Sequence, residues 1–339
     1  MRSVKPFGRK SAVLFAASVL VAAVAAYGVW RLWRFGADQM RRSAVVVVCE
    51  EWNSVDVDGK QLFYFLALEG DTIMTGITLC RDSAVHRHYA GGVWVDRCFA
   101  RPSCDGLVAS VVPKECHDAV LPDSAGIYAL CRDAVVRRFK TLRGRKAELD
   151  YYLCAHGVQD AEYHLIASLA TAVRRDYNDV VGVGVKLEEV GSGARFSVVT
   201  HRKYTVVCRD SVGRVLRLAC KQMAAEKGSR LVLLQTDGGA MPPSAKPVAV
   251  MPWNASAKGG IRVVGFGGTG ESGLECDTVL PQILPGNAAH PLRHDIPQVL
   301  AADGSPVFTA KGRFVGLLAA DSIIGRRQLR RLIEKGGRQ

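Results

Sequence analysis

The segment around residue 303 holds the side chains whose types and spacing come closest to a reaction centre. Asp303 and Ser305 flank a glycine and precede a proline, in a turn-forming DGSP tetrapeptide between apolar stretches. A carboxylate and a hydroxyl both act as nucleophiles in enzymes, but serine requires a base that accepts its proton. His201 and His294 are the imidazoles considered for this role, so one hypothesis for the segment is a Ser305–histidine dyad.

The remaining candidate motifs predict neither a metal nor a cofactor. The ten cysteines include no C-x-x-C pair, so neither a zinc ribbon nor a dithiol redox centre is indicated. Cys116-His117 and Cys154-x-His156 fit buried thiols and surface imidazoles better than metal ligands. The GFGGTG run at 265–270 matches a dinucleotide fingerprint, but two prolines and no helical face follow it. We therefore expect no metal and no cofactor.

The elements that must position these residues are mainly strands. Short β-type runs bounded by Gly, Pro and Asp dominate residues 44–121 and 194–320. Residues 124–178 differ, because they contain no proline and carry apolar side chains at helical spacing. We predict a helical pair there, broken near Gly157. Residues 328–334 predict an amphipathic, arginine-rich helix near the C-terminus.

A family resemblance rests on the segment DIPQVLAADGSPVFTAKGRFVGLLA, residues 295–319. It resembles the nucleophile region of trypsin-like serine proteases, especially the bacterial HtrA-like branch. That region has an Asp-led run, then G-[ND]-S-G-G-P, an apolar pair and a hairpin whose strand ends in V-G-[IL]. The family's serine falls on Asp303. Ala301 and Ala302 precede it where the family has Gly and then Asn or Asp, and Gly304 and Ser305 follow it as the remaining vestige of the site.

The two other catalytic positions are also occupied by residues that cannot perform the family's chemistry. SRLVLLQ at 229–235 resembles the strand that carries the catalytic Asp, and Arg230 stands at that position. The best match to the His-bearing strand is 91–113, which places Pro113 on the His. The alternative match, 194–203, places Lys203 there instead. None of these side chains can accept the proton of serine or orient an imidazole.

The resemblance implies a mainly β fold of two six-stranded antiparallel β-barrels. The first would comprise residues 44–236 with the helical insertion 124–178. The second would comprise residues 247–325, beginning with PVAVM and IRVVGFGGTG. Residues 326–339 would form a basic C-terminal helix and tail. The family's catalytic Asp and Ser positions face each other across the cleft between barrels, so we expect an ion pair between Arg230 and Asp303. The alternative is that Arg230 points to solvent and Asp303 caps its own turn.

The positive charge of the chain is confined to its two ends. The formal net charge is +13, but residues 1–42 hold eight Lys or Arg against one Asp, and residues 325–339 hold six against one Glu. The intervening 282 residues are therefore close to neutral. This distribution is typical of membrane flanks and does not predict a basic groove for nucleic acid.

Residues 11–30 contain no charged side chain and are long enough to span the hydrocarbon core of a bilayer. Four cations precede this run, as in a signal sequence, and small residues within it leave cleavage as the alternative. We predict an uncleaved single-pass signal anchor, with residues 1–10 as a cytoplasmic tail. The resemblance implies that the folded part lies on the extracytoplasmic, periplasmic side.

These observations predict a membrane-anchored pseudoprotease that binds a peptide or an envelope protein and does not hydrolyse it. The first alternative is a divergent serine endopeptidase that uses a non-standard nucleophile such as Ser305. The second is a structural subunit of an envelope complex that docks through residues 124–178.

Overall fold

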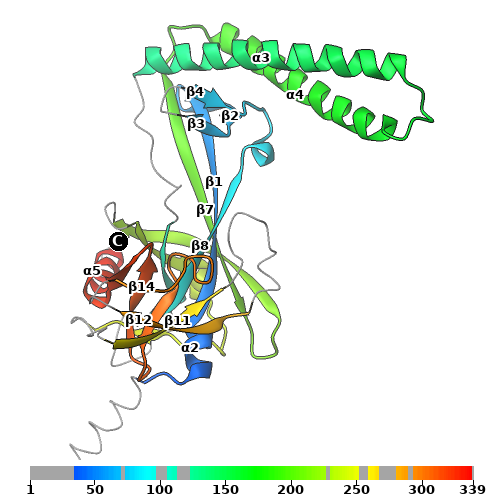
Figure 1. Cartoon of the computed structure of the whole chain (residues 1–339). Helices are drawn as coiled ribbons and strands as arrows, with labels where there is room; N and C mark the ends of the chain where they lie inside the picture. Colours follow the sequence, from blue (N-terminus) through cyan, green and yellow to red (C-terminus); the bar gives the residue numbers. More distant parts are fainter. Residues whose placement is uncertain are drawn as a thin grey trace, which may run out of the picture. The chain divides into compact units, whose positions relative to one another are not determined.

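The computed structural model describes residues 34–69, 73–96, 105–112, 123–226, 230–251, 259–266, 280–288 and 293–337 (Figure 1). The chain divides into two compact units. The first unit comprises Met1–Val48, Tyr89–Pro113 and Tyr204–Gln339, and the second comprises Cys49–His88 and Lys114–Lys203. Strands dominate the first unit, and a pair of long helices belongs to the second.

Six strands form one closed β-barrel. In ring order they are β1 (Ala44–Val57), β5 (His86–Asp96), β6 (Leu107–Val111), β9 (Leu231–Thr236), β8 (Val215–Glu226) and β7 (Phe196–Arg209). The additional pairing of β5 with β1 closes the ring. Three of these strands precede the helical insertion and three follow it, so the prediction that both stretches build one barrel is confirmed. Loop-closure entropy grows only slowly with loop length, so an insertion of this size is compatible with closure.

The first strand is apolar throughout its first half because both of its faces are buried. Ala44, Val46 and Val48 belong to the main hydrophobic cluster of the first unit. Val45 and Val47 point the other way, since their methyl groups are the nearest neighbours of a side chain built at Gly92. A strand covered on both faces reads as a continuous run of β-branched residues, which explains the sequence AVVVVC.

A second sheet has five antiparallel strands. Their order is β12 (Gln282–Ala288), β11 (Gly259–Gly265), β13 (Pro306–Thr309), β14 (Phe314–Ala319) and β15 (Ser322–Gly325). No pairing closes this sheet among the residues that the structure describes, so the predicted second six-stranded barrel is not shown. The PVAVM segment contributes β10 (Val248–Ala249), which pairs in parallel with β5 of the first sheet. It joins the first sheet because Val248 and Val250 are buried in the main cluster.

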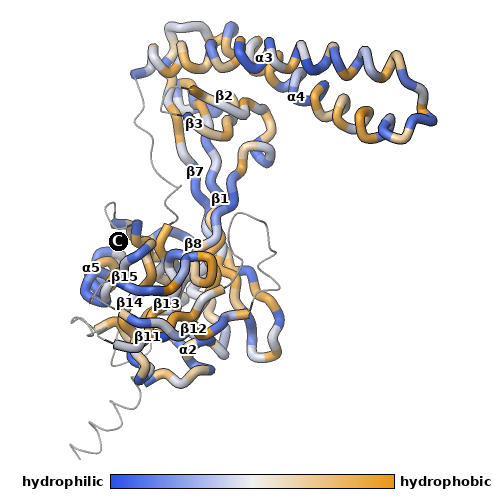
Figure 2. The backbone as a smooth tube through the Cα atoms, viewed as in Figure 1, coloured by the Kyte–Doolittle hydropathy of each residue, from blue (hydrophilic) through white to orange (hydrophobic). Residues whose placement is uncertain are grey.

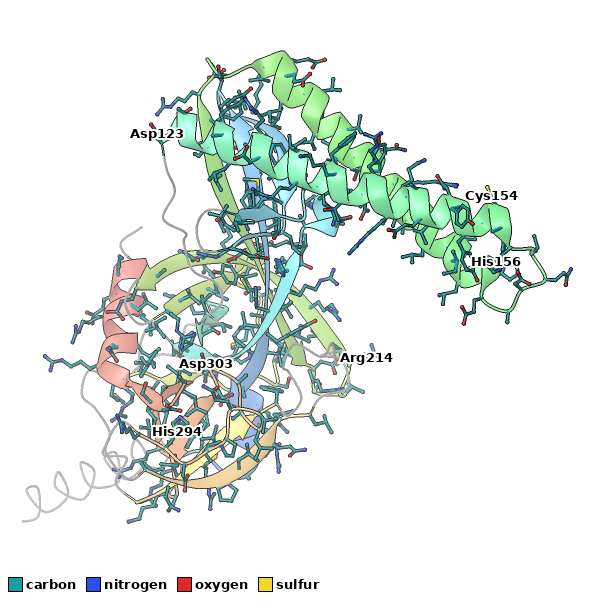
Figure 3. The ribbon with its side chains drawn as sticks, turned by 45° about the horizontal axis from the view of Figure 1, so that its top comes forward. Asp123, Cys154, His156, Arg214, His294 and Asp303 are labelled. Carbon is teal, nitrogen blue, oxygen red and sulfur yellow. The ribbon has the colours of Figure 1, made fainter. Side chains whose placement is uncertain are left out.

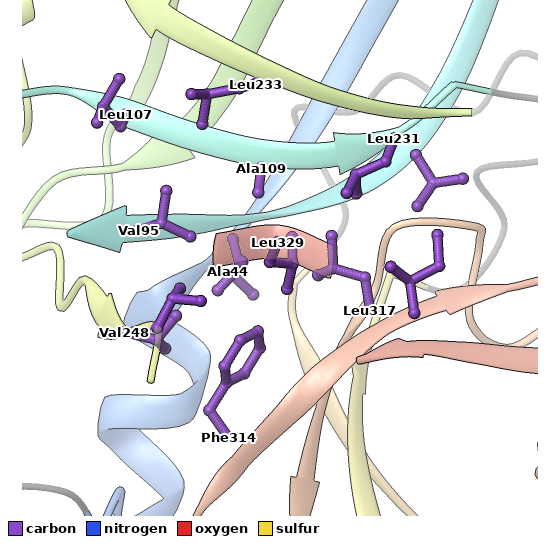
Figure 4. Close-up of a cluster of buried hydrophobic side chains, with 14 of the residues drawn as sticks. Ala44, Val95, Leu107, Ala109, Leu231, Leu233, Val248, Phe314, Leu317 and Leu329 are labelled. Atoms are coloured by element: carbon purple, nitrogen blue, oxygen red, sulfur yellow. The ribbon is translucent and has the colours of Figure 1, made fainter. Parts of the chain in front are cut away.

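The barrel and the five-stranded sheet share this main cluster. Figure 4 shows side chains of β6 and β9, such as Leu107 and Leu231, lying opposite Phe314 and Leu317 of β14. Helix α5 (Arg326–Gly336) adds Leu329 and further apolar side chains to the same cluster. This shared core holds the start of β9 and the loop before β13 in one unit.

The predicted C-terminal helix is confirmed as α5, and it packs on strands of the barrel. Figure 2 shows it as largely hydrophilic, yet Leu329, Leu332 and Ile333 are buried against β8 and β9. Arg327 and Arg331 are exposed, and the apolar stripe of the helix faces the core. A short helix that the sequence did not predict, α2 (Ala37–Ser43), leads directly into β1.

The helical insertion of the second unit is a pair of helices, as predicted. Helix α3 (Ser124–Ala155) and helix α4 (Tyr163–Val190) are separated by a connection that contains Gly157. The side chain of Asp123 caps α3 by accepting a hydrogen bond from Gly126 N at 2.9 Å. The predicted end at residue 178 is corrected to Val190.

Two glycines in the part of α4 after residue 178 lie close to neighbouring elements. A side chain built on Gly182 would lie 3.1 Å from a methyl of Leu79, and one on Gly184 would lie 3.4 Å from a methyl of Val135. Glycine weakens an isolated helix, but here it permits close packing of neighbouring elements.

The other elements of the second unit are β2 (Lys60–Phe65), β3 (Ala67–Glu69), β4 (Ile73–Thr75) and the 3₁₀ turn η1 (Arg81–Ser83). In the first unit, a second 3₁₀ turn, η2 (Asp237–Gly239), follows β9.

No helix among the described residues is long and apolar enough to cross a membrane. Residues 11–30, the predicted signal anchor, lie outside the described residues. The anchor therefore stays a prediction.

Cys131 provides a pH-dependent test of the packing between α3 and its neighbours. Burial raises the pKa of the Cys131 thiol to about 12. In the unfolded chain the thiol ionises at lower pH, so its contribution to stability is complete below about pH 9 and declines as the pH rises toward 12. We expect the free energy of unfolding of the unmodified protein to fall more steeply above pH 9 than that of Cys131→Ala, by up to about 1.4 kcal/mol per pH unit.

Urea unfolding between pH 8 and pH 10 measures this difference. Cys154→Ala is the matched control, because Cys154 lies on the same helix but is exposed. If Cys131→Ala and the unmodified protein had the same slope, burial of the thiol in the folded state would be wrong.

Candidate functional site

The predicted ion pair between Arg230 and Asp303 is present. Arg230 Nη1 lies 2.8 Å from Asp303 Oδ2, and the two side chains are 24% and 17% exposed. Arg230 comes directly before β9, and Asp303 lies in the loop before β13, where Figure 3 labels it. The expectation that these two positions face each other is confirmed. The partial burial of both groups means that water screens their attraction less than it would at the surface.

The second oxygen of Asp303 is also engaged. Oδ1 accepts a hydrogen bond from the backbone N–H of Ala320 at 2.6 Å, so the carboxylate reaches the turn between β14 and β15. The backbone carbonyl of Asp303 accepts a hydrogen bond from Gly91 N at 2.7 Å. Asp303 therefore ties together three segments: the strand β5, the turn after β14 and the residue before β9.

Arg230 adopts a backbone conformation that is unusual for a residue with a side chain. Its φ is +56°, in the left-handed region. Its carbonyl accepts the N–H of Val112 at 2.8 Å, and its Nη1 donates to the carbonyl of Val112 at 3.0 Å. These contacts hold the guanidinium against the end of β6 and toward Asp303, and they offset the strain of the backbone.

The loop before β13 approaches β5 so closely that side chains are excluded at the contact. Gly304 has φ +84°, and a Cβ atom built on it would lie 2.0 Å from the carbonyl oxygen of Gly91. A Cβ atom on Gly91 would lie 2.5 Å from the backbone nitrogen of Ser305. Ser110 Oγ donates to the same Gly91 carbonyl at 2.6 Å. Both glycines are needed for backbone to meet backbone at this point.

Ser305 is inside the protein. Its exposed fraction is 0%, and its Oγ is buried without a hydrogen-bond partner in the described part of the chain. The preceding Ala301 is also buried. A substrate carbonyl could reach this hydroxyl only if the loop were displaced.

Both histidines of the dyad hypothesis form hydrogen bonds with groups other than Ser305. His294 Nε2 donates to the carbonyl of Ala320 at 2.8 Å, and its Nδ1 accepts the N–H of Ile296 at 3.2 Å. His201 belongs to the second unit, where its Nε2 lies 2.9 Å from Ser54 Oγ and its ring stacks on Trp52.

The two candidate positions for the family's histidine have different outcomes. Pro113 lies outside the described residues, although Val112, which precedes it in the chain, contacts Arg230. Lys203 lies within β7 in the second unit, with its Nζ 3.8 Å from Glu50 Oε2. Which of them corresponds to the histidine stays a prediction.

Three residues that hold the site together were not singled out by the sequence, namely Gly91, Val112 and Ala320. They contribute backbone groups, so their side chains carry no signal of the role. The Gly91-Gly92 pair inside a strand-like run was the one visible hint, because glycine in a strand often marks a close backbone approach. Within the described ranges, no three His, Cys, Asp or Glu side chains are arranged to hold a metal ion.

Comparison with known proteins gives distant likenesses to solved structures alone. No protein-family profile and no curated protein sequence matches the chain. Among solved structures, the chain is similar to the crystal structure of Deg5 over 84% of this chain and 85% of that one, with 13% identical residues and a TM-score of 0.35. The mainly β fold with its closed six-stranded barrel is defined by the strand pairings of this chain itself.

Proposed function

We propose that this protein is a trypsin-like pseudoprotease that binds a peptide or an envelope protein without hydrolysing it. The observation that carries the proposal is the 2.8 Å ion pair between Arg230 and Asp303. By the sequence resemblance, these residues stand where the family has its catalytic Asp and Ser. An ion pair between them replaces a proton relay by a structural link.

The chemistry of the pair is incompatible with acyl transfer through the family's mechanism. A carboxylate has no proton to lose on attack, and a guanidinium cannot act as a base or orient an imidazole. One oxygen of Asp303 binds Arg230 and the other binds the N–H of Ala320. Both oxygens are therefore committed within the protein.

The endopeptidase alternative has less support, because its proposed nucleophile is covered. Ser305 has no exposed surface, and the contact between Gly304 and Gly91 lies directly beside it. His294 uses both ring nitrogens in other hydrogen bonds. A serine in these surroundings lacks both access to substrate and a base.

The remaining parts of the proposal follow from the sequence. Residues 11–30 would anchor the protein in a membrane, and the folded part would lie on the extracytoplasmic side. The second candidate is a role as a structural subunit. Exposed apolar side chains at the connected ends of α3 and α4 favour it. Tyr151 is 78% exposed and Leu165 is 71% exposed. Large apolar side chains in such positions often mark protein contacts.

Fluorescein-labelled casein tests hydrolysis and binding in one experiment. We expect the full chain to leave casein intact and to elute with it in gel filtration. Asp303→Ser alone should also leave it intact, because the His and Asp partners of a triad are missing as well. Neither protein should react with a fluorophosphonate probe.

Ser305→Ala is the control for the endopeptidase alternative. Casein cleavage by the unmodified protein that disappears in Ser305→Ala would refute the pseudoprotease proposal. Casein that is neither cut nor bound would favour the structural subunit.

A further inference from the structure

The first unit contains a cavity that is separate from the Arg230–Asp303 site. Its volume is about 610 Å³, within the range of small-molecule sites. It lies among α2, the start of β1, the β7–β8 turn and residues 280–283. Arg230, Asp303 and Ser305 do not line it. The function proposed for the Arg230–Asp303 site therefore does not involve this cavity.

Most of the residues that line the cavity are apolar. Val46 and Val207 come from the barrel strands β1 and β7, and Ile283 comes from β12. Trp94 and Phe266, both buried, complete the apolar lining. Aromatic and branched side chains in a concave site favour an apolar ligand body, since each removes a large area from water.

Three arginines border the same cavity. Arg41 and Arg42 come from the last turn of α2, and Arg209 ends β7. Arg42 is paired with Asp38 at 2.9 Å, and Arg209 Nη1 donates to the carbonyl of Gly213 at 2.8 Å. Within the described residues, no ion pair is formed by Arg41, whose side chain is exposed. Arg41 is therefore the cation best placed to receive a ligand charge.

The acidic residue in the lining does not cancel this charge. Asp210 Oδ1 accepts the backbone N–H groups of Arg214 and Val212, both at 2.8 Å. The hydrogen bond from Arg214, followed by the others in the turn, holds the pKa of Asp210 below its ordinary value. Its carboxylate is thus committed to its own turn, and the net charge of the lining is positive.

We infer that this cavity binds an anionic amphiphile, specifically a free long-chain carboxylate. The apolar chain would lie against Trp94 and Phe266, and the carboxylate would pair with the guanidinium of Arg41. Guanidinium and carboxylate groups form bidentate, charge-assisted hydrogen bonds, which a neutral head group cannot replace. The combination of a largely apolar cavity with Arg41 at its border favours this class of ligand.

A photoactivatable long-chain carboxylate and the same chain ending in an alcohol test the inference on the full protein. After irradiation, labelled peptides are identified by mass spectrometry. We expect the carboxylate to label peptides from the β7–β8 turn and residues 280–283 about tenfold more than the alcohol does. Labelling of residues 11–30, which are apolar in every variant, serves as the internal reference.

Arg41→Gln should lower labelling by the carboxylate at the cavity to the level of the alcohol. Arg214→Gln is the matched control, because Arg214 is an exposed cation of the adjoining turn and does not line the cavity. Val215→Trp, which adds bulk at the cavity wall, should reduce labelling by both probes. Thermal unfolding of each variant establishes that it is folded.

Several results would overturn the inference. One is equal cavity labelling by the carboxylate and the alcohol, and another is the same labelling in Arg41→Gln as in the unmodified protein. A third is displacement of the probe by a peptide with an apolar C-terminus but not by unlabelled fatty acid. That result would assign the cavity to protein C-termini.

Discussion

Replacing Gly304 by alanine is expected to destabilise the first unit by about 3 kcal/mol or more. Two effects add at this position. The backbone has φ +84°, which alanine adopts only with strain, and the new methyl would lie 2.0 Å from the carbonyl oxygen of Gly91. That oxygen belongs to a strand of the closed barrel, so it cannot move without disturbing the pairing of β5 with β6. Urea unfolding of the purified variant measures the change.

Gly213→Ala separates the two effects. Gly213 has φ +87°, nearly the same conformation, but a Cβ atom there would have no neighbour within 4 Å. We expect this control to lose about 1 kcal/mol, which is the contribution of the backbone alone. If Gly304→Ala and Gly213→Ala had equal effects, the close approach of the loop to β5 would be wrong.

A double-mutant cycle on Arg230 and Asp303 is expected to show a coupling energy of about 1–2 kcal/mol. Both side chains are mostly buried, and removing either one leaves the other charge partly buried without its partner. The double variant removes both charges, so it should be more stable than the sum of the single effects predicts. Chemical unfolding of Arg230→Ala, Asp303→Ala and the double variant supplies the four corners of the cycle.

An exposed ion pair in the same unit provides the comparison. Arg42 and Asp38 are 2.9 Å apart, close to the 2.8 Å between Arg230 and Asp303, but their side chains are 49% and 68% exposed. Their coupling should be at most about 0.5 kcal/mol. Strict additivity at Arg230 and Asp303 would refute the ion pair as a stabilising link.

Arg230→Gly should be less destabilising than Arg230→Ala, because glycine adopts the φ of +56° without strain.

Much of the barrel was predictable because its strands carry local signals. Runs such as AVVVVC and LVLLQ are dense in β-branched and aliphatic residues, and turn residues separate them. The helical pair was predictable for the same reason, since its apolar spacing and the break near Gly157 are local features. The ion pair between Arg230 and Asp303 was expected from two separate motif matches, one for each residue, and the structure contains it.

The sequence could not reveal contacts that depend on backbone groups or on partners far along the chain. The residue types around Gly91 do not indicate that the backbone N–H of Gly91 donates a hydrogen bond to the carbonyl of Asp303. The burial of Ser305 follows from that same contact, so the sequence left this hydroxyl as a candidate nucleophile. The five-stranded sheet was expected to close as a barrel because the resemblance implied it, and pairing between distant strands has no local signature.

The division of the barrel strands around helices α3 and α4 has a consequence for the protein during its synthesis. Strands β1, β5 and β6 leave the ribosome early, but the ring cannot close until β9 has been made. At ~5–20 residues per second, the interval between residue 112 and residue 236 lasts about 6–25 s. The helical pair has local contacts and can form within a small fraction of that time. Meanwhile β1 and β6 lack their partners β7 and β9, and strand edges left unpaired in this way favour association with other chains until the second half has been made.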